Sequence, residues 1–230
     1  MTELSGAHVL VVGATGGLGS ATARALAARG ATVTLTGRSA ERLSTLADEI
    51  GQAVRGTVSA DLVNPGSAAQ LIEAARQHGG GRLNGVVFAA GVVAFGAVTD
   101  LDDDVLDQLV LVNLMAPIRI AREAARVLPD GGFLATISAI VAEQPQKGMA
   151  AYSATKAGLT GFDRALSAEL RRRITVLDIR PVHTETGLVN RAIAGTAPQL
   201  PPGAAPDDVA RRIVDAIESG EKDLPSTAFG

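Results

Sequence analysis

The sequence predicts an α/β protein with a doubly wound parallel sheet and helices on both faces of that sheet. Short apolar runs rich in β-branched residues alternate with longer helix-like segments along the whole chain, which is the arrangement of successive βαβ units. The runs are apolar throughout, as expected of strands that are covered on both faces. No repeat or linker-like change in composition divides the 230 residues, so we expect one domain over residues 1–230.

The expected strands and helices alternate in order along the chain. The strands are the runs His8–Val12, Thr32–Thr36, Val54–Val58, Gly85–Ala89, Gly132–Ile137 and Ile174–Ile179. The helices between them cover Leu18–Arg29, Ala40–Glu49, Gly66–His78, Asp103–Leu128 and Ala150–Arg172. A last amphipathic helix is expected over Pro206–Ser219, because a proline followed by acidic residues is typical of a first helical turn.

One segment lacks any regular pattern. Ala194–Pro206 holds four prolines and two glycines, which favour a loop. We expect a mobile loop on the substrate side over residues 184–206. A plain surface connection and a lid over a substrate are the two alternatives that the sequence leaves open.

The composition excludes several classes of protein. The chain is 47% hydrophobic and 20% charged, which is too apolar for a disordered protein. It has no cysteine, so a disulfide framework, a thiolate metal site and a cysteine nucleophile are excluded, and its three histidines stand singly, so we expect no metal site. A net charge of −3 without a basic block, together with 3% aromatic residues, argues against nucleic acid and anionic membranes as partners.

The chain shows no pattern for secretion or membrane insertion. Its first residues lack a charged region and a cleavage site of the kind that signal peptides carry. The longest uncharged stretch, Leu83–Thr99, is interrupted by glycines and is short for a bilayer span. We therefore expect a cytoplasmic protein.

A glycine-rich turn follows the first expected strand. It reads Gly13-Ala14-Thr15-Gly16-Gly17-Leu18-Gly19 and leads directly into a helix. Glycines at such a turn let the backbone approach a pyrophosphate, which the helix N-terminus stabilises. The strand before it and the helix after it supply the context that a dinucleotide site requires. The alternative is a turn that serves only the packing of the helix on the strand.

Four polar residues are candidates for catalysis. Tyr152, the only tyrosine, precedes Lys156 by one helical turn, so their side chains share one helix face. A nearby ammonium favours the phenolate and lowers the pKa of a phenol from about 10. Ser138 follows the strand Gly132–Ile137 at the sheet edge where ligands bind. Asn113 interrupts an apolar helical stretch, either as a core amide or as part of a relay.

These motifs, in this order and spacing, resemble the short-chain dehydrogenase/reductase family in its compact, single-domain subgroup. The resemblance runs from Ala7 to about Thr186 and implies a Rossmann-type fold. It also implies an NAD(P)-dependent oxidoreductase that interconverts a carbonyl and an alcohol. In the reductive direction it implies that the Ser138 hydroxyl holds the substrate carbonyl and that Tyr152 donates the proton. Lys156 is then expected to bind the nicotinamide ribose and lower the pKa of Tyr152, and Asn113 to link the proton path to solvent.

The end of the second strand indicates which dinucleotide is preferred. NAD-preferring folds place an acidic residue there for the ribose 2′-hydroxyl, whereas this chain has Gly37 and Arg38. A guanidinium pairs well with the 2′-phosphate of NADP, so we expect NADP(H) to be preferred and NAD(H) to remain possible. A second basic residue that the family often has in the glycine turn is Gly16 here, which suggests a mild preference.

The resemblance extends to further cofactor contacts. At the glycine turn these are Gly13, Thr15, Gly16, Gly17, Leu18 and Gly19. Later along the chain they are Arg38, Asp61, Leu62, Ala89, Ala90, Gly91, Tyr152, Lys156, Pro181, Thr184 and Thr186. Two departures stand out: Phe88-Ala89 replaces an Asn pair, and Val182 follows Pro181 where the family has glycine.

Two other functions compete with the carbonyl–alcohol oxidoreductase. The first is an NAD(P)-binding regulator or sensor without turnover, which Val182 keeps open. The second, an epimerase or dehydratase of the extended subgroup, would need more chain for a substrate domain. The residues near Ile140–Gln146 and Glu185–Pro206 are small or apolar, which suggests an uncharged or partly apolar carbonyl or alcohol substrate.

The helix after Ala150 suggests self-association. It carries many small residues, and related enzymes pair such helices between subunits, so we expect a homodimer or homotetramer. These small residues are Ala154, Ala157, Gly158, Gly161, Ala165 and Ala168.

Overall fold

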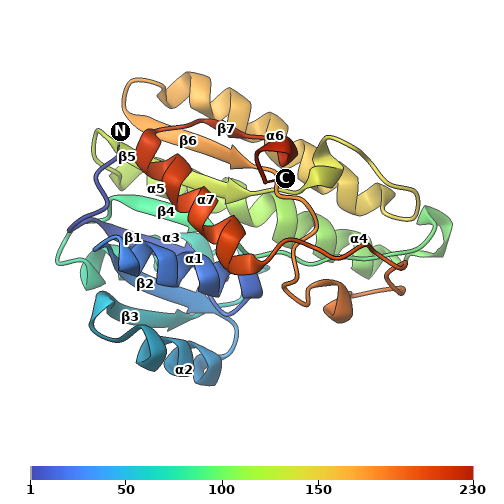
Figure 1. Cartoon of the computed structure of the whole chain (residues 1–230), viewed down its shortest axis with the longest axis horizontal. Coiled ribbons are helices and arrows are strands. Elements are labelled where there is room, and N and C mark those ends of the chain that lie inside the picture. The colour runs from blue at the N-terminus through green and yellow to red at the C-terminus, as the bar shows by residue number, and fades with distance from the viewer. Residues whose placement is uncertain (1, 230) are drawn as a thin grey trace.

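The computed structural model describes residues 2–229 and contains a seven-stranded sheet with helices on both faces (Figure 1). The strands lie in the order β3-β2-β1-β4-β5-β6-β7, and all six neighbouring pairs are parallel. The strands are β1 (His8–Val12), β2 (Thr32–Gly37), β3 (Val54–Ser59), β4 (Gly85–Phe88), β5 (Gly132–Ile137), β6 (Ile174–Ile179) and β7 (Asp223–Leu224). The predicted doubly wound fold is confirmed, and the six expected strands agree with the structure to within one residue. The short strand β7 was not expected.

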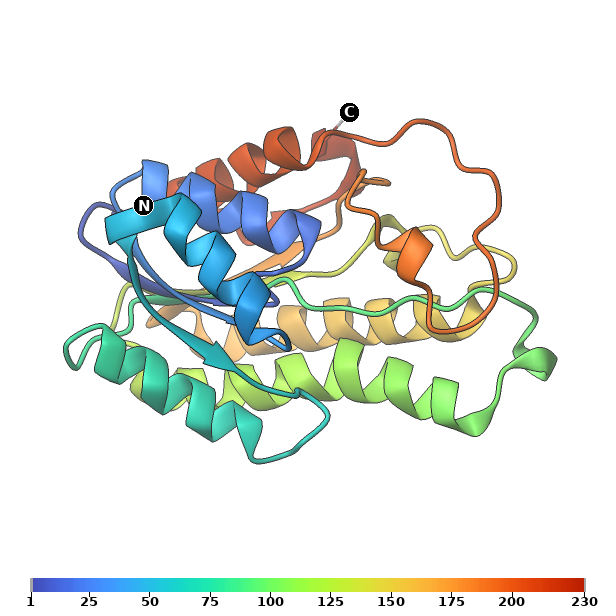
Figure 2. The same ribbon diagram turned by 90° about the horizontal axis from the view of Figure 1, so that it is seen from below.

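Residues 2–229 form seven α-helices. They are α1 (Gly17–Ala28), α2 (Ala40–Ile50), α3 (Ser67–His78), α4 (Asp103–Val110), α5 (Ala116–Val127), α6 (Ala150–Leu170) and α7 (Pro206–Ser219). Figure 2 shows α1, α2 and α7 on one side of the sheet and α3, α5 and α6 on the other. Each side has its own apolar core, because the odd and even residues of every central strand point to opposite faces.

The single helix expected over Asp103–Leu128 is interrupted in the structure. Between α4 and α5 lies one π-helical turn, Leu111–Met115, with Asn113 at its centre. Pro117 explains the interruption. It has no N–H to donate to the carbonyl of Asn113 four residues earlier, and its ring crowds that carbonyl. Such single π-turns within helices are frequent at functional sites.

The segment expected to be a mobile loop is irregular apart from a short helical turn, Val189–Arg191. One bridge joins Ala194 to Ala94, outside the segment, and a second joins Thr184 to Ala204, so the two ends of the segment lie side by side. Figure 2 shows the connection as a wide arc at one end of the molecule. Its mobility stays a prediction.

A buried cation joins the C-terminal part of the chain to the sheet. Arg180, at the end of β6, is 2% exposed and pairs with Asp178, with Glu143 at 2.5 Å and with Asp223 of β7 at 2.7 Å. Glu143 also accepts a hydrogen bond from the hydroxyl of Ser226 at 2.5 Å. The turn that precedes α6 and the last strand are therefore held by the same guanidinium.

A buried carboxyl lies between α6 and the sheet. Asp163 is 1% exposed, accepts a hydrogen bond from the Thr136 hydroxyl through Oδ2, and has no partner for Oδ1 among residues 2–229. Burial raises the pKa of Asp163 to about 8, and Asp178 acts in the same direction. The Thr136 bond, Lys156 and Arg180 act against it. Asp163 therefore keeps its proton at neutral pH.

We predict that Asp163→Asn makes the protein less sensitive to alkaline pH. The folded protein holds this proton more tightly than the unfolded chain, whose Asp pKa is about 3.9. The resulting contribution to stability is complete below that value and is lost as the pH rises through about 8. Asparagine keeps the shape and has no charge to bury. The difference in Tm between the variant and the wild type should therefore increase steadily from pH 5 to pH 9.

The matched control is Asp130→Asn, at a side chain 80% exposed in a surface ion pair with Arg173. Its Tm difference from the wild type should stay nearly constant with pH. A constant difference for Asp163→Asn as well would show that Asp163 is not protonated in the folded protein.

Candidate active site

The glycine turn lies at the carboxyl end of β1, beside β4, where the strand order of the sheet reverses. Gly13 has a φ of +82°, and a Cβ there would lie 2.6 Å from the backbone of Ala90. A Cβ at Gly19 would lie 2.2 Å from the carbonyl oxygen of Gly13. Only glycine fits at these two positions, because the chain's own backbone occupies the space that a side chain would take. The turn lies at the reversal point, where doubly wound sheets bind dinucleotides.

The start of α1 supplies hydrogen-bond donors to this turn. The bond from the Ser20 amide to the Gly16 carbonyl, at 2.9 Å, opens the helix. The amides of Gly17, Leu18 and Gly19 precede it and lie at the N-terminal end of the helix, a ready anion site. The side chain of Leu18 is buried in the core, so only its backbone can contact a ligand.

The segment after β6 reaches the same turn. A Cβ at Gly17 would lie 2.7 Å from that of Thr186, so Thr186 lies directly against the glycine turn. Thr184 is less available, because its hydroxyl donates to the carbonyl of Val182 at 2.9 Å. Pro181 lies beside the end of β5, where its carbonyl accepts from the amide of Ile140 at 3.0 Å. Val182, the expected glycine position, has an ordinary negative φ, so no strain arises there.

The residues after β2 and β3 flank the turn on its other side. Arg38 is exposed, and its carbonyl accepts a hydrogen bond from Ser59 at 3.0 Å. The carboxylate of Asp61 accepts from the amide of Val63 at 3.1 Å, which makes a local turn. Leu62 packs against the core on the α3 side. Asp61 therefore forms a local turn, with one carboxylate oxygen engaged.

Sequence reasoning missed one cation in this region. The guanidinium of Arg42, in the first turn of α2, donates to the carbonyl of Thr15 at 2.5 Å. Gly37 allows this approach, because a Cβ at that position would lie 2.8 Å from the Thr15 hydroxyl. The sequence spacing between the two elements carries no signal for this contact.

Asn113 is fully buried and belongs to a defined network. Its side-chain oxygen accepts from the amide of Val92, its nitrogen donates to the carbonyl of Val92, both at 2.9 Å, and the nitrogen also lies 3.4 Å from the Thr155 hydroxyl. A Cβ at Gly91 would lie 3.3 Å from Asn113 Oδ1 and 3.6 Å from Lys156 Nζ. The end of β4, the π-helical turn and the lysine therefore meet at one point.

Tyr152 and Lys156 lie together on α6, as predicted. The ammonium is 5.8 Å from the centre of the phenol ring and donates to the carbonyl of Ile137 at 2.9 Å. Burial lowers the pKa of Lys156 to about 8, against the opposing effect of Asp163 and Asp178. Burial raises the pKa of Tyr152, so the expected lowering by the ammonium is not found. The cause is that the phenol is 7% exposed and its desolvation dominates.

Ser138 does not face the phenol. Its hydroxyl is 3% exposed, donates to the carbonyl of Lys156 at 2.9 Å and lies 3.4 Å from the Thr160 hydroxyl. The neighbouring Ala139 packs in the apolar cluster that contains Tyr152. The contact of the Ser138 hydroxyl with a substrate carbonyl stays a prediction. The hydroxyl points to the α6 side of the sheet, where it is engaged with the helix backbone.

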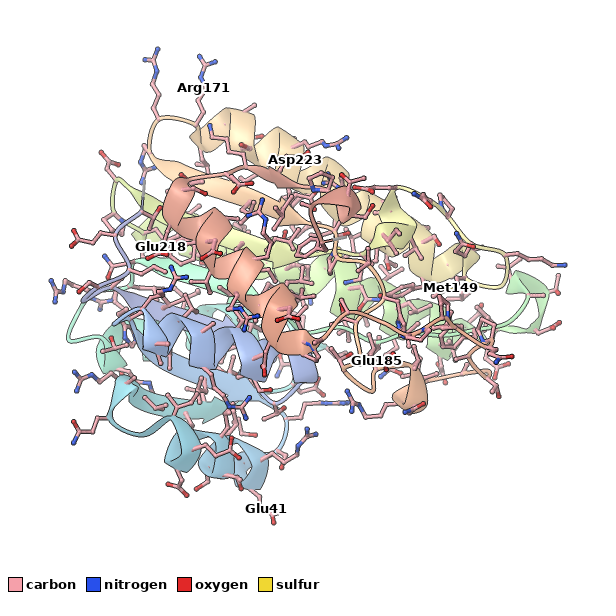
Figure 3. The ribbon with its side chains drawn as sticks, viewed as in Figure 1. Glu41, Met149, Arg171, Glu185, Glu218 and Asp223 are labelled. Carbon is pink, nitrogen blue, oxygen red and sulfur yellow. The ribbon has the colours of Figure 1, made fainter. Side chains whose placement is uncertain are left out.

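The surroundings of Tyr152 on the substrate side are apolar. Phe95, Val141 and residues of the 184–206 loop form one cluster with the phenol ring. A cavity of about 500 Å³ is lined by residues of that loop together with His183. Its polar lining comes from His183, Glu185, Asn190 and Thr196, and His183 lies 3.5 Å from the Glu185 carboxylate. Figure 3 shows Glu185 at the same end of the molecule as Met149, which precedes α6.

Within residues 2–229, no helix has the length and apolar character needed to cross a membrane. No three histidine, aspartate or glutamate side chains of the described residues gather in a way that would hold a metal ion.

Comparison with known proteins identifies the family. The family model described as short chain dehydrogenase matches residues 7–196. Nodulation protein G of Rhizobium sp. (strain N33) is 35% identical over 197 residues, which are 83% of this chain and 78% of that protein. The cyclic-di-GMP-binding biofilm dispersal mediator protein of Escherichia coli (strain K12) is 33% identical over 195 residues, covering 83% of this chain and 79% of that protein.

The solved structures agree with this result. A short-chain dehydrogenase from Burkholderia cenocepacia J2315 in complex with NADP is 29% identical, with a TM-score of 0.87 over 98% of each chain. A blue fluorescent protein from a metagenomic library, in complex with NADPH, is 25% identical with a TM-score of 0.87 and covers 99% of this chain and 98% of its own. This chain belongs to the short-chain dehydrogenase/reductase family, with the Rossmann-type fold of an NAD(P)-dependent oxidoreductase.

Proposed function

We propose that this protein interconverts a carbonyl and an alcohol with NADP(H), and that Tyr152 donates the proton in reduction and accepts it in oxidation. One observation carries the proposal: the buried phenol and the buried ammonium of Lys156 lie one helical turn apart, on the sheet edge that holds the glycine turn. The nicotinamide supplies the hydride when it is bound. The protein has to place the carbonyl beside Tyr152 and to manage the proton.

The phenol is suited to act as an acid. Because burial raises its pKa, Tyr152 is fully protonated at neutral pH and has a proton to give. Proton donation leaves a phenolate in an apolar environment, which is unfavourable unless a positive charge is close. The ammonium of Lys156 lies at 5.8 Å from the ring and stabilises that phenolate. The same ammonium, next to Gly91, is placed to bind a ribose hydroxyl.

Ser138 is assigned a positioning role in this mechanism. Its hydroxyl holds the carbonyl of Lys156, and the Lys156 ammonium holds the carbonyl of Ile137. The phenol O–H is then the principal hydrogen-bond donor for a substrate carbonyl. Asn113 keeps the role of linking the proton path to solvent. Two observations support this role: its hydrogen bonds with Val92 and Thr155, and its backbone carbonyl, to which Pro117 has no N–H to donate.

The preference for NADP(H) is supported by the charges beside the glycine turn. Arg38 is exposed there, Gly37 and Arg38 stand where NAD-preferring folds have an acid, and similar structures hold NADP or NADPH. The apolar cluster around Tyr152 favours a substrate whose carbonyl carries an apolar group, and the polar cavity beyond it admits a more polar end.

We place the protein in the cytoplasm.

A homo-oligomer is proposed on the exposure of the small residues of α6. All six small residues of this helix are exposed, and a Cβ at Gly161 would have no neighbour within 4 Å. These residues are Ala154, Ala157, Gly158, Gly161, Ala165 and Ala168. Small exposed residues let a second helix approach closely, and this face of α6 has no covering element in the described chain.

One observation favours a second candidate function, an NAD(P)-binding regulator without turnover. The Ser138 hydroxyl is engaged with the Lys156 carbonyl rather than with the phenol. A relative of this chain is named for cyclic-di-GMP binding rather than for an oxidoreductase activity. Turnover assays with NADPH and a panel of ketones, aldehydes and alcohols distinguish the two functions.

We predict that Tyr152→Phe abolishes most turnover and leaves cofactor binding intact. The change removes one oxygen and keeps the ring in its apolar cluster. Loss of a positioned proton donor lowers the rate by about a hundredfold or more. The measurements are steady-state turnover of any accepted carbonyl and NADPH binding by fluorescence. Ser138→Ala is the matched comparison and should lose less than Tyr152→Phe. Undiminished turnover by Tyr152→Phe would refute the mechanism.

We predict that turnover depends on pH through the charge of Lys156. Lys156 has a pKa of about 8, so its charge is present below that pH and is lost above it. Turnover at saturating NADPH should therefore fall as the pH rises through about 8. Lys156→Arg, which stays charged, should move this decline to higher pH. A wild-type rate that stays level up to pH 10 would exclude a required ammonium.

We predict that the protein assembles into a homo-oligomer. Light scattering at micromolar concentration should give a dimer or tetramer of the 23.4 kDa chain. Gly161→Glu places a charge and bulk on the exposed face of α6, away from the monomer core, and should shift the population toward monomer. A wild-type monomer would contradict the proposal.

A further inference from the structure

We propose that Asp163 is a positioning residue for the reaction: its buried carboxyl group keeps the ammonium of Lys156 charged when the solution becomes alkaline. This role rests on the proposed function, in which that ammonium stabilises the phenolate of Tyr152. It assigns a task to a buried titratable group that the mechanism above does not use.

Asp163 and Lys156 are fixed to consecutive residues of β5. The ammonium of Lys156 donates to the carbonyl of Ile137 at 2.9 Å, and the carboxyl of Asp163 accepts from the hydroxyl of Thr136. Along α6 the two residues are about two helical turns apart, which places them on the same face of the helix. Both are buried. The carboxyl and the ammonium therefore lie in one layer between α6 and the end of β5.

The surroundings of Asp163 strengthen the effect of its charge. Its Oδ1 atom has no hydrogen-bond partner among residues 2–229. A small cavity of about 10 Å³ beside it is lined mainly by apolar side chains of β4, β5, α5 and α6, among them Phe88, Ile120 and Leu166. Apolar surroundings screen a charge weakly, so a carboxylate formed here acts on a neighbouring ammonium more strongly than one at the surface does.

In the described part of the chain, Asp163 forms no ion pair, whereas the other carboxyl of this layer does. Asp178, on β6, is paired with the guanidinium of Arg180 and accepts from the hydroxyl of Thr160 at 3.3 Å. The residues of β4 and α5 that line the small cavity carry no charge. Ionisation of Asp163 therefore adds a negative charge that no cation pairs with directly and that acts on Lys156.

The titration of the two groups agrees with this arrangement. Burial raises the pKa of Asp163 to about 8 and lowers the pKa of Lys156 to about 8, so both titrate in the same range. Among the charged groups, Asp163 raises the pKa of Lys156 most, followed by Asp178. Tyr152 stays neutral in this range, because burial raises its pKa. As the pH rises, the carboxylate that forms at Asp163 opposes the loss of the ammonium proton.

The competing explanation is that Asp163 only joins α6 to β5 through Thr136. The two explanations differ in the sign of one effect. A buried carboxyl with a raised pKa destabilises the folded protein at alkaline pH, so Asp163→Asn gains stability there relative to the wild type. A carboxyl that supports Lys156 predicts that the same variant loses turnover at alkaline pH. Unfolding of the variant cannot produce that combination.

NMR of labelled lysine tests the proposal without turnover. The chain has three lysines, of which Lys147 and Lys222 are exposed, and Lys156→Met identifies the signal of the third. The titration midpoint of Lys156 should lie about one pH unit lower in Asp163→Asn than in the wild type, the size expected of one opposite charge in a buried site. Asp163→Ser, a smaller neutral replacement, should give the same displacement and serves if the amide fits poorly.

Turnover gives the second readout. The ratio of Asp163→Asn to wild-type turnover, at saturating NADPH, should fall about tenfold between pH 6 and pH 9. The reason is that one pH unit changes the charged fraction of Lys156 about tenfold above its midpoint. The matched control Asp130→Asn removes an exposed carboxylate that is paired with Arg173, and it should change neither the lysine midpoint nor the ratio.

Two results would overturn the role of Asp163. One is a midpoint of Lys156 that both neutral replacements leave in place. The other is a lowered midpoint with an unchanged pH profile of turnover. A wild-type protein that turns over no carbonyl would instead overturn the proposed function, and the lysine midpoint would still decide whether Asp163 supports the ammonium.

Discussion

The geometry of the site depends on two crossed hydrogen bonds between β5 and α6. The Ser138 hydroxyl donates to the backbone of Lys156, and the Lys156 side chain donates to the backbone of Ile137. Each bond ties a strand residue to a helix residue, and together they fix the height and the rotation of α6 over the end of the sheet. Tyr152, one turn earlier, is positioned by the same pair of bonds. The Ser138 hydroxyl can therefore affect the orientation of the phenol through the position of α6.

Burial decides the electrostatics of the same region. The lysine, the phenol and two aspartates lie within one layer between α6 and the sheet, and each is desolvated. Desolvation raises the pKa of the acids and lowers that of the lysine, so at neutral pH the layer tends toward its least charged form. The ammonium is the charge that remains closest to the phenol. Loss of the Tyr152 proton is therefore unfavourable unless the Lys156 ammonium stabilises the phenolate that it leaves.

The sequence predicted the fold and the position of the glycine turn, because both depend on local patterns. Apolar runs locate strands, and Gly13 and Gly19 sit where any side chain would clash, so their identity alone is informative. The direction of the Ser138 hydroxyl was not predictable from its position after β5, since adjacent residues there face opposite sides and only packing tells which side holds the phenol. Pro117 did carry a usable signal for the break in the helix, which was overlooked. The contact of Arg42 with Thr15 joins two turns whose relative placement only the folded chain defines.

The shared cation Arg180 couples two parts of the molecule that look independent in the sequence. It holds Glu143, in the turn that leads into α6, and Asp223 in β7, while Glu143 also holds Ser226. The last residues of the described chain thereby help to hold the turn that leads into α6. An affinity tag or a fusion partner joined at this end would disturb the turn that leads into α6. The same addition near Thr2, whose amide donates to the carbonyl of Glu218, would disturb only the end of α7.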